Sequence, residues 1–235
     1  YPEHAVAGLL PIAFGKAGEA QDNARLALRL LLDNGHQALI EEVAGRYQQP
    51  EVLVAVSALV ELDPLNDFPA KRPALPPFWQ PVLWTRPQLH NGKALPEEAL
   101  THLGTMLRFP TENGRYPGLD QVKAACTPAS LANFAWDLYN AWMAASAPPK
   151  EGWAFSTLGL FGNDDIARRL TPLIRSWPGE SQHKRAVAGL EILADIGTDI
   201  ALMQLNGIAQ KLKFKALQER AREKISQIAE KRELT

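Results

Sequence analysis

Two adjacent carboxylates in the later half of the chain are residue types that acid–base or metal chemistry uses. Asp164 and Asp165 lie in the stretch GLFGNDDIARRL, and Arg168 and Arg169 follow one helical turn later. Such a pair could act as a general acid and base, or bind a hard cation through its oxygen atoms. The alternative is structural: Asn163 or Asp164 caps a helix, and each aspartate pairs with the arginine four residues later. No further metal ligand lies nearby in the sequence, so the structural interpretation is favoured.

Other patterns associated with catalysis or cofactor binding are incomplete. The helical zinc-protease pattern, His-Glu-x-x-His, is absent, because no two of the five histidines are four residues apart with a glutamate between them. There is no Gly-x-Ser-x-Gly stretch, and GLLPIAFGKA has Ala17 where a phosphate-binding loop needs Ser or Thr. Cys126 precedes a proline at a predicted helix start, where a buried, inert thiol is favoured over a reactive one. We expect no catalytic residue, no metal ligand and no cofactor, and therefore a protein that is not an enzyme.

The carboxyl-terminal segment 207–235 is basic, with eight Lys and Arg residues against four Glu residues. A basic strip of this kind could contact the phosphates of a nucleic acid. The charges surround the predicted helix rather than gather on one face, so a solvated outer surface is the favoured interpretation. Five cations of the later half are our candidates for contact with a partner: Arg168, Arg169, Lys211, Lys215 and Arg222.

Length and composition are those of an ordinary globular protein. The chain has 235 residues, of which 46% are hydrophobic and 22% charged, enough for one large domain or two small ones. A net charge of −1 gives no overall attraction to nucleic acid or to an anionic membrane. The longest apolar run, VLVAVSALV, is about half the length of a membrane span, so we expect no membrane partner. The single cysteine cannot form an internal disulfide and suits a reducing compartment. Because the first residue is Tyr1, we also expect a piece of a longer protein.

Helical periodicity dominates the chain, and the helices come in pairs. NARLALRLLLDNG has a broad apolar face and ends at Gly35. Both WAFSTLGLFG and AVAGLEILADIG end in a glycine that precedes a polar turn and a second amphipathic helix. Just downstream, Ile166-Ala167 matches Ile200-Ala201 at an offset of 34 residues, and AVAGL occurs twice, at Ala5 and Ala186. Paired helices with a period in the thirties predict an all-α fold of the α–α superhelix, or α-solenoid, class.

One predicted helix differs from the others in being apolar on two sides. TPASLANFAWDLYNAWMAA begins with Thr127 as the cap and Pro128 in the first turn. Its two apolar faces predict burial on both sides, in the middle of the stack.

A proline-rich segment interrupts the helices. Eight prolines lie between Pro64 and Pro96, which excludes a regular helix there. Aromatic side chains bury large areas, so a segment that contains several of them is expected to be ordered and packed on the helices. The aromatic residues concerned are Phe68, Phe78, Trp79 and Trp84.

Beyond these patterns, part of the chain resembles known proteins. LADIGTDIALMQLNGIAQK followed by ALQERAREKISQIA resembles a HEAT-like repeat of the bacterial lyase-associated type. A longer run resembles large bacterial proteins called molybdate metabolism regulators. It extends from FAWDLYNAWMAA through APPKEGWAFSTLGLFGNDDIARRLTPLIRSWPG and HKRAVAGLEILADIGTDIALMQLNGIAQKLKFKALQERA to ELT. These proteins carry a domain of unknown function, often beside a domain named for its Trp-Gly-Arg (WGR) signature. The likeness covers Ala124 to Thr235 and implies a cytoplasmic protein. It supplies no catalytic residue, and this chain shows neither a molybdate ligand set nor the Trp-Gly-Arg motif.

Together these observations predict one continuous solenoid domain in three parts. The parts are N-terminal helical repeats (1–62), an ordered Pro- and aromatic-rich crossover (63–98) and C-terminal HEAT-like repeats (99–235). The favoured function is a non-enzymatic scaffold of a bacterial regulatory protein, linked to molybdate metabolism by resemblance, that binds a protein partner on its concave face. One alternative is a nucleic-acid-binding solenoid that uses the basic carboxyl-terminal helices. A second alternative is an enzyme with a pocket between the Trp-rich helix and the crossover.

Overall fold

The regular structure is helical throughout the part of the chain that is described. The computed structural model describes residues 2–47, 71–109 and 115–231, and the single residues 52, 54, 56, 65 and 69. These residues contain no β-strand, and their extended pairings are two isolated bridges, Gln88 with Ala94 and Leu89 with Cys126. The prediction of an all-α protein is confirmed.

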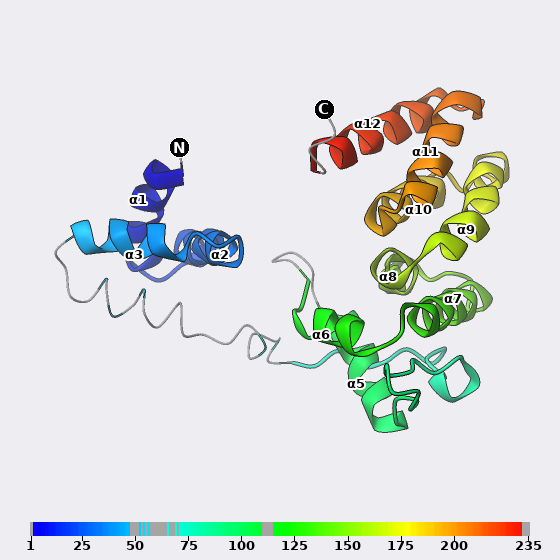
Figure 1. Cartoon of the computed structure of the whole chain (residues 1–235), viewed down its shortest axis with the longest axis horizontal. Helices are drawn as coiled ribbons and strands as arrows, with labels where there is room; N and C mark the ends of the chain where they lie inside the picture. Colours follow the sequence, from blue (N-terminus) through cyan, green and yellow to red (C-terminus); the bar gives the residue numbers. More distant parts are fainter. Residues whose placement is uncertain are drawn as a thin grey trace. The chain divides into compact units, whose positions relative to one another are not determined.

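The chain forms two compact units, which are described separately (Figure 1). The smaller unit comprises Tyr1–Phe68 and Pro110–Gly114, and the larger unit comprises Pro69–Phe109 and Arg115–Thr235. The three-part division and the single continuous solenoid therefore stay predictions.

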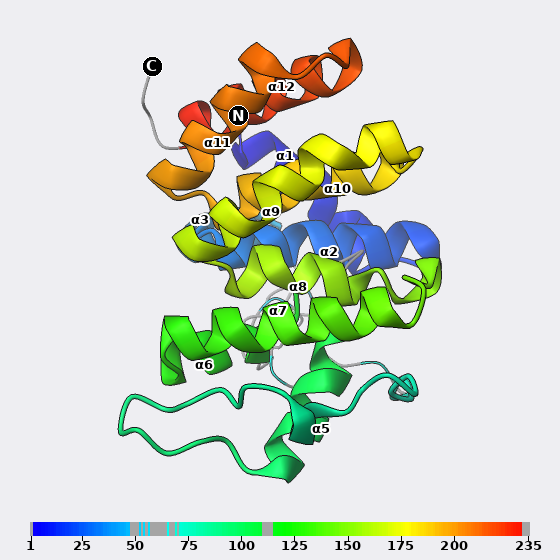
Figure 2. The same cartoon turned by 90° about the vertical axis from the view of Figure 1, so that its right-hand side faces the viewer.

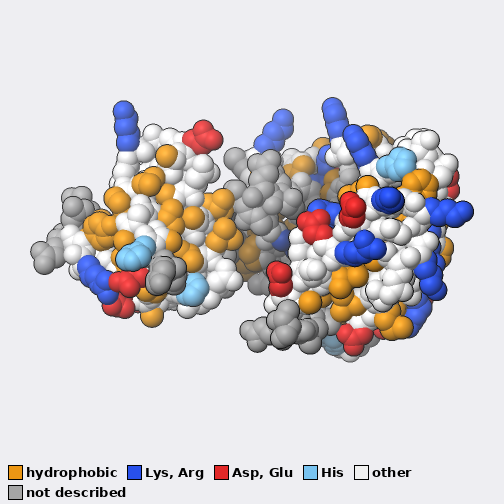
Figure 3. Space-filling view, turned by 90° about the horizontal axis from the view of Figure 1, so that it is seen from above, with side chains coloured by type: hydrophobic (Ala, Val, Ile, Leu, Met, Phe, Trp, Pro, Cys, Tyr) orange, Lys and Arg blue, Asp and Glu red, His pale blue; other side chains and the backbone are white. Residues whose placement is uncertain are grey.

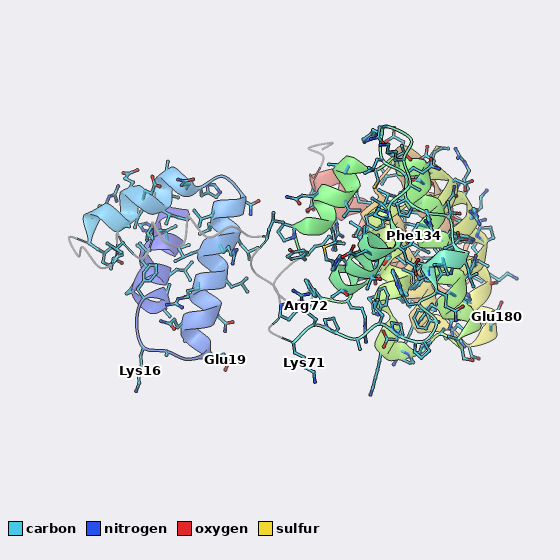
Figure 4. The ribbon with its side chains drawn as sticks, turned by 90° about the horizontal axis from the view of Figure 1, so that it is seen from below. Lys16, Glu19, Lys71, Arg72, Phe134 and Glu180 are labelled. Atoms are coloured by element: carbon cyan, nitrogen blue, oxygen red, sulfur yellow. The ribbon has the colours of Figure 1, made fainter. Side chains whose placement is uncertain are left out.

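Three helices make up the described part of the smaller unit: α1 (Pro2–Ala13), α2 (Glu19–Asp33) and α3 (Gln37–Arg46). Their apolar faces meet in a core that includes Val6, Leu10 and Leu28. As predicted, Gly35 follows the end of α2, with a φ of 82° that suits glycine. Figure 4 labels Lys16 and Glu19 beside the turn from α1 to α2. Most of the apolar run VLVAVSALV lies outside the described residues.

The larger unit contains eight α-helices in its described residues and three short 3₁₀ turns. The helices are α5 (Glu97–Leu107), α6 (Gly118–Ala125), α7 (Pro128–Ala144), α8 (Trp153–Phe161), α9 (Asp164–Ser176), α10 (His183–Ile196), α11 (Asp199–Lys211) and α12 (Lys215–Lys231). The 3₁₀ turns are η2 (Pro81–Leu83), η3 (Pro149–Glu151) and η4 (Trp177–Glu180).

From α7 onward the helices of the larger unit lie in two rows. Helix α8 packs on α10 and α10 packs on α12, while α9 packs on α11 in the other row. Cross-contacts of α7 with α8, α9 with α10, and α11 with both α10 and α12 join the rows. Figures 1 and 2 show the resulting stack, which rises from α7 to α12. One continuous hydrophobic core runs through the stack, from Leu100 in α5 to Ile228 in α12.

Helix α7 is buried on two sides, as its sequence predicted. On one side Phe134, which Figure 4 labels, and Leu138 are fully buried. On the other, Tyr139 is buried while Trp136 and Met143 are only partly covered. The predicted cap, Thr127, occupies the N-cap position, but its hydroxyl bonds to the Ser130 hydroxyl (2.8 Å) instead of a backbone N–H.

The proline-rich segment is packed against α7 over its described residues 71–96. The Trp79 ring meets Trp84 and Phe134 edge-on, at centroid distances of 5.1 and 5.9 Å. The backbone N–H of Gln88 donates to the Ser130 hydroxyl (2.8 Å), and that of Thr85 donates to the Asp137 carboxylate (2.8 Å). These contacts agree with the order that the aromatic residues predicted. Phe68 lies outside the described residues.

Two helix pairs, α8–α9 and α10–α11, share one design of turn. The Asn163 side chain accepts hydrogen bonds from the N–H groups of Asp165 and Ile166 (3.1 Å each), so Asn163 is the cap of α9. In α11 the Thr198 hydroxyl accepts from the N–H of Ala201 (3.2 Å). The caps are 35 residues apart, like the two glycines before them, so the offset of 34 residues inferred from Ile-Ala is wrong by one residue.

The second sequence match, AVAGL, does not mark equivalent positions. In α1 Val6 is fully buried, and a Cβ atom on Gly8 would meet nothing within 4 Å. In α10 Val187 is 36% exposed, and a Cβ atom on Gly189 would lie 2.5 Å from Ile174 Cγ1. The two copies therefore turn different sides toward their cores, and the pentapeptide is not evidence of a repeat.

Candidate functional site

The two aspartates that suggested chemistry belong to the first turn of α9. Asp165 is exposed and pairs with Arg169 at 3.5 Å, as the four-residue spacing predicted. The second predicted pair, Asp164 with Arg168, is not formed in the described structure. Instead, Asp164 Oδ1 is buried, and no hydrogen bond reaches it within the described residues. The reason is that Asp164 turns inward at the helix start while Arg168 remains exposed.

A metal site is not found at these carboxylates. Among the described residues, no group of three or more His, Cys, Asp or Glu side chains could hold a metal ion. The first turn of α9 carries a side-chain cap and two acidic residues at the positive end of the helix dipole, which are common features of a helix start.

Helix α9 has one fully buried side and one exposed side. Ile166, Leu170 and Ile174 are fully buried on one side. On the other side Arg168, Arg169 and Arg175 are exposed. We call these three residues the arginine face. Arg168 and Arg175 have no ion pair within the part of the chain that the structure describes.

The arginine face touches both neighbours of α9 in its row. The guanidinium carbon of Arg169 lies 4.0 Å from the centre of the Trp136 ring on α7, a cation–π contact. On the other side, a Cβ atom on Gly207 of α11 would lie 3.1 Å from Arg175 Nη2. Arg175 and Trp136 were not among the residues predicted from the sequence. Arg175 could have been found from the sequence, because it follows Arg168 by seven residues and therefore lies on the same side of the helix.

The other predicted partner residues lie where α11 meets α12. Lys211 ends α11 and Lys215 begins α12, and both side chains are exposed. Arg222 of α12 donates from Nη2 to the backbone carbonyl of Ala209 (3.3 Å), which ties the two helices together. The five predicted residues thus occupy two places, the arginine face and the α11–α12 junction.

Two further cations of the basic carboxyl-terminal segment hold α12 on α10. Arg220 donates to the Glu191 carboxylate from Nε and Nη2 (2.9 and 2.6 Å), and Lys224 Nζ pairs with its other oxygen. Burial raises the pKa of Glu191, but the hydrogen bonds from Lys224 and Arg220 outweigh it, so the net pKa lies below its ordinary value. These contacts give part of the basic segment a structural role.

The region proposed for an enzyme pocket is occupied by aromatic side chains. Between α7 and the proline-rich segment, Trp79 and Trp84 pack on Phe134. Nearby, Cys126 is buried, and burial raises the pKa of its thiol, so the nucleophilic thiolate is disfavoured. Burial also raises the pKa of Tyr139, against the opposing charge of Arg185.

Arg185 is another cation held by aromatic rings. Its guanidinium carbon lies 5.6 Å from the Trp142 ring centre and 5.8 Å from that of Trp177. Because Trp142 lies in the last turn of α7 and Arg185 in the first turn of α10, this contact joins two helices of different rows. We therefore assign Arg185 a structural role in the packing of these helices rather than a role in a functional site.

Comparison with known proteins gives a relative but no family. The chain is 44% identical over 237 residues to "Uncharacterized protein YehI" of Escherichia coli (strain K12). That alignment includes all of this chain but only 20% of the relative, so the chain spans about a fifth of the relative's length. No protein-family model matches the chain. No solved structure matches it either. Among the described helices, none combines the length and apolar character that crossing a membrane requires.

Proposed function

We propose that this chain is a non-enzymatic, HEAT-like interaction module that binds a protein partner on the row formed by α7, α9 and α11. The proposal is carried by the arginine face of α9. The buried side of α9 accounts for its packing, whereas Arg168 and Arg175 form no ion pair within the described residues. Exposed arginines are common anchors of protein interfaces, because a planar guanidinium binds carboxylates through two hydrogen bonds.

The stacking of helix pairs supports the solenoid part of this proposal. Two successive pairs share a glycine, a side-chain cap and a second helix of 13 residues. Their contacts run to neighbouring pairs, and in solenoids such contacts leave extended surfaces open for partners.

We further propose that the module belongs to a large, cytoplasmic regulatory protein. The relative from Escherichia coli is about five times as long as the matched region, which leaves room for other domains. The resemblance to molybdate metabolism regulators supports a regulatory role, and the buried free Cys126 suits a reducing compartment. In this proposal the module binds a protein partner and not molybdate itself.

Affinity capture from the native host tests the proposal. The purified chain, immobilised through its amino terminus, is expected to retain a specific protein at physiological salt. Capture that yields no protein above a bead-only control contradicts the proposed function.

Nucleic-acid binding is the second candidate, and it has its own observation. Lys211, Lys213 and Lys215 are all exposed at the α11–α12 junction. Binding through these lysines would weaken steeply as salt rises, because phosphate contacts release counterions. Failure to bind DNA or RNA at low salt in a gel-shift experiment contradicts this candidate.

A further inference from the structure

We infer that the partner segment is acidic, carries an apolar anchor residue, and binds across α9 and α11. The inference deepens the proposed function, on which it rests, by naming the surface and the chemistry of its ligand. Four observations support it: the spacing of the arginines, an exposed methionine on the neighbouring helix α11, the support of Arg169 by Trp136, and the Asp165 carboxylate beside the arginines.

The arginine face has a spacing that a short peptide can match. Arg168 and Arg175 are seven residues apart on one helix, so they lie on the same side about 10 Å apart along its axis. A polyproline II segment has three residues per turn and rises about 3.1 Å per residue, so two carboxylates three residues apart lie on the same side, about 9 Å apart. A segment with an acidic residue at every third position can therefore pair with both arginines at once.

An apolar contact lies beside these cations. Met203 on α11 is 67% exposed, although apolar side chains of its size are usually covered. A Cβ atom on Gly207 of α11 would lie 3.1 Å from Arg175 Nη2, so Arg175 reaches this part of α11. Met203 lies one turn before Gly207 on the same helix, about 6 Å along its axis, and is therefore close to the position that Arg175 reaches. Methionine adapts its shape to irregular apolar partners, which suits an anchor site.

The view in Figure 3 agrees with this arrangement. Lys and Arg side chains gather along the edge of the larger unit on its α9 and α11 side. Hydrophobic side chains interrupt them, so the surface is mixed rather than uniformly basic. A mixed surface complements a segment that is both acidic and apolar.

Arg169 is held in place before any partner arrives. Its guanidinium rests on the Trp136 ring at 4.0 Å and pairs with Asp165 at 3.5 Å. The 3.5 Å pair is long, which leaves N–H groups of Arg169 available to a second carboxylate. A positioned arginine loses less conformational freedom when it binds, so less affinity is lost to ordering.

Charge distinguishes a protein partner from a nucleic acid at this surface. Asp165 lies beside Arg169 on α9, and the whole chain has a net charge of −1. A phosphate backbone carries a charge at every nucleotide and would meet this carboxylate. A short acidic segment can place its carboxylates only where the arginines are.

Fluorescence anisotropy with defined probes tests the inference. The main probe is a labelled synthetic peptide with Glu at every third position and Leu between; the comparison probes replace Glu by Lys, or use single-stranded oligothymidylate of equal length. The acidic peptide is expected to bind, and the other two are not. The double variant R168E/R175E is expected to weaken binding at least about tenfold, because two attractions become repulsions.

Matched variants separate this surface from general electrostatics. K93E/K123E makes the same change in net charge at two exposed lysines on other elements, and is expected to stay within about twofold of the wild type. Met203→Ser is expected to weaken binding by about fivefold with no change in charge. Circular dichroism of each variant confirms that it is folded. Equal loss in both double variants, or tighter binding of oligothymidylate than of the acidic peptide, overturns the inference.

A crosslinking experiment separates failure of this inference from failure of the proposed function. A photo-reactive residue at position 203, or at position 93 as a comparison, is introduced into the full protein in its native host. Protein adducts at position 203 that disappear in R168E/R175E support the inference. Adducts formed only at position 93 overturn it and leave the proposed function standing, whereas adducts at neither position, with no protein captured by the purified chain, contradict both.

Discussion

The helix pairs α8–α9 and α10–α11 follow one plan, yet they present different side chains to the outside. Each has a glycine, a capping side chain and a second helix of 13 residues. The fifth residue after the cap is Arg168 in one pair and the exposed Met203 in the other. The fold therefore specifies the turn and the buried side, and leaves the outward residues free. The contacts of Arg169 with Trp136 and Asp165 account for one of the α9 arginines, whereas Arg168 and Arg175 have no ion pair within the described residues.

Even the shared glycines are required for different reasons. Gly162 has an ordinary φ of −69°, but a Cβ atom there would lie 2.2 Å from the Leu158 carbonyl oxygen and 2.7 Å from Ile196 Cδ1. Gly197 has a φ of 59°, in the left-handed region that other residues adopt at a cost. One glycine makes room for the neighbouring pair, and the other turns the backbone.

The largest effects are expected where the two pairs are alike. Leu158 and Leu193 are both fully buried, so Leu158→Ala and Leu193→Ala should each lower the free energy of unfolding by about 3 kcal/mol. Urea unfolding followed by tryptophan fluorescence measures this in the larger unit, which contains all six tryptophans. A loss below about 1 kcal/mol for only one of them would show that the two pairs are not equivalent.

Substitution of the two glycines should affect stability differently in the two helix pairs. Gly162→Ala is expected to cost about 3 kcal/mol, because the clash involves backbone and a packed isoleucine. Gly197→Ala is expected to cost about 1 kcal/mol, the cost of a left-handed non-glycine residue. The same unfolding experiment measures both, and the reverse order would contradict the assigned reasons.

Removal of the two caps should also lower stability more in the α8–α9 pair than in the α10–α11 pair, but by a smaller margin. Asn163 accepts hydrogen bonds from two backbone N–H groups, and Thr198 accepts one. Asn163→Ala is therefore expected to cost about 1.5 kcal/mol and Thr198→Ala about 1 kcal/mol. Serine at each position serves as the control, since it should retain most of the stability.

Local signals in the sequence predicted these turns well. Pro128 and Gly35 were assigned correctly, and Asn163 was one of two candidates for the cap of α9, because caps, first-turn prolines and terminal glycines act within a few residues. The pair Asp164–Arg168 was predicted and did not form, because the inward turn of Asp164 depends on tertiary packing.

Contacts between helices could not be predicted in the same way. The approach of Arg175 to Gly207 depends on the packing of α9 on α11, which no spacing within one helix encodes. The repeated AVAGL misled for the same reason, since the neighbours of a helix decide which of its sides is buried. The sequence therefore indicated helices and their ends, but not the face that a partner would meet.

The ion pairs that join α10 to α12 through Glu191 give a pH-dependent prediction. The pKa of Glu191 is lowered in the folded state, so its stabilisation is present above the ordinary glutamate pKa and is lost as pH falls through the folded-state pKa. Glu191→Gln is expected to cost about 1 kcal/mol or less at neutral pH, because the side chain is 35% exposed.

The check on Glu191 is the difference in unfolding free energy between wild type and Glu191→Gln as a function of pH. The difference should shrink toward zero as pH falls below that range. A difference that grows on acidification would contradict the assignment.

The smallest effect on stability, and the largest on binding, is expected for the arginine face. R168E/R175E changes exposed residues that have no ion pair within the described structure, so its unfolding free energy should stay within about 0.5 kcal/mol of the wild type. A larger loss would show that these arginines belong to the fold, as Arg185 and Arg220 do.

The most direct test is to measure both properties of R168E/R175E side by side: its urea midpoint, and its affinity for the acidic, leucine-containing peptide. We expect an unchanged midpoint together with at least about a tenfold loss of affinity. An unchanged affinity, or a loss of affinity that only follows a lowered midpoint, would contradict the proposal that α9 carries its arginines for a partner.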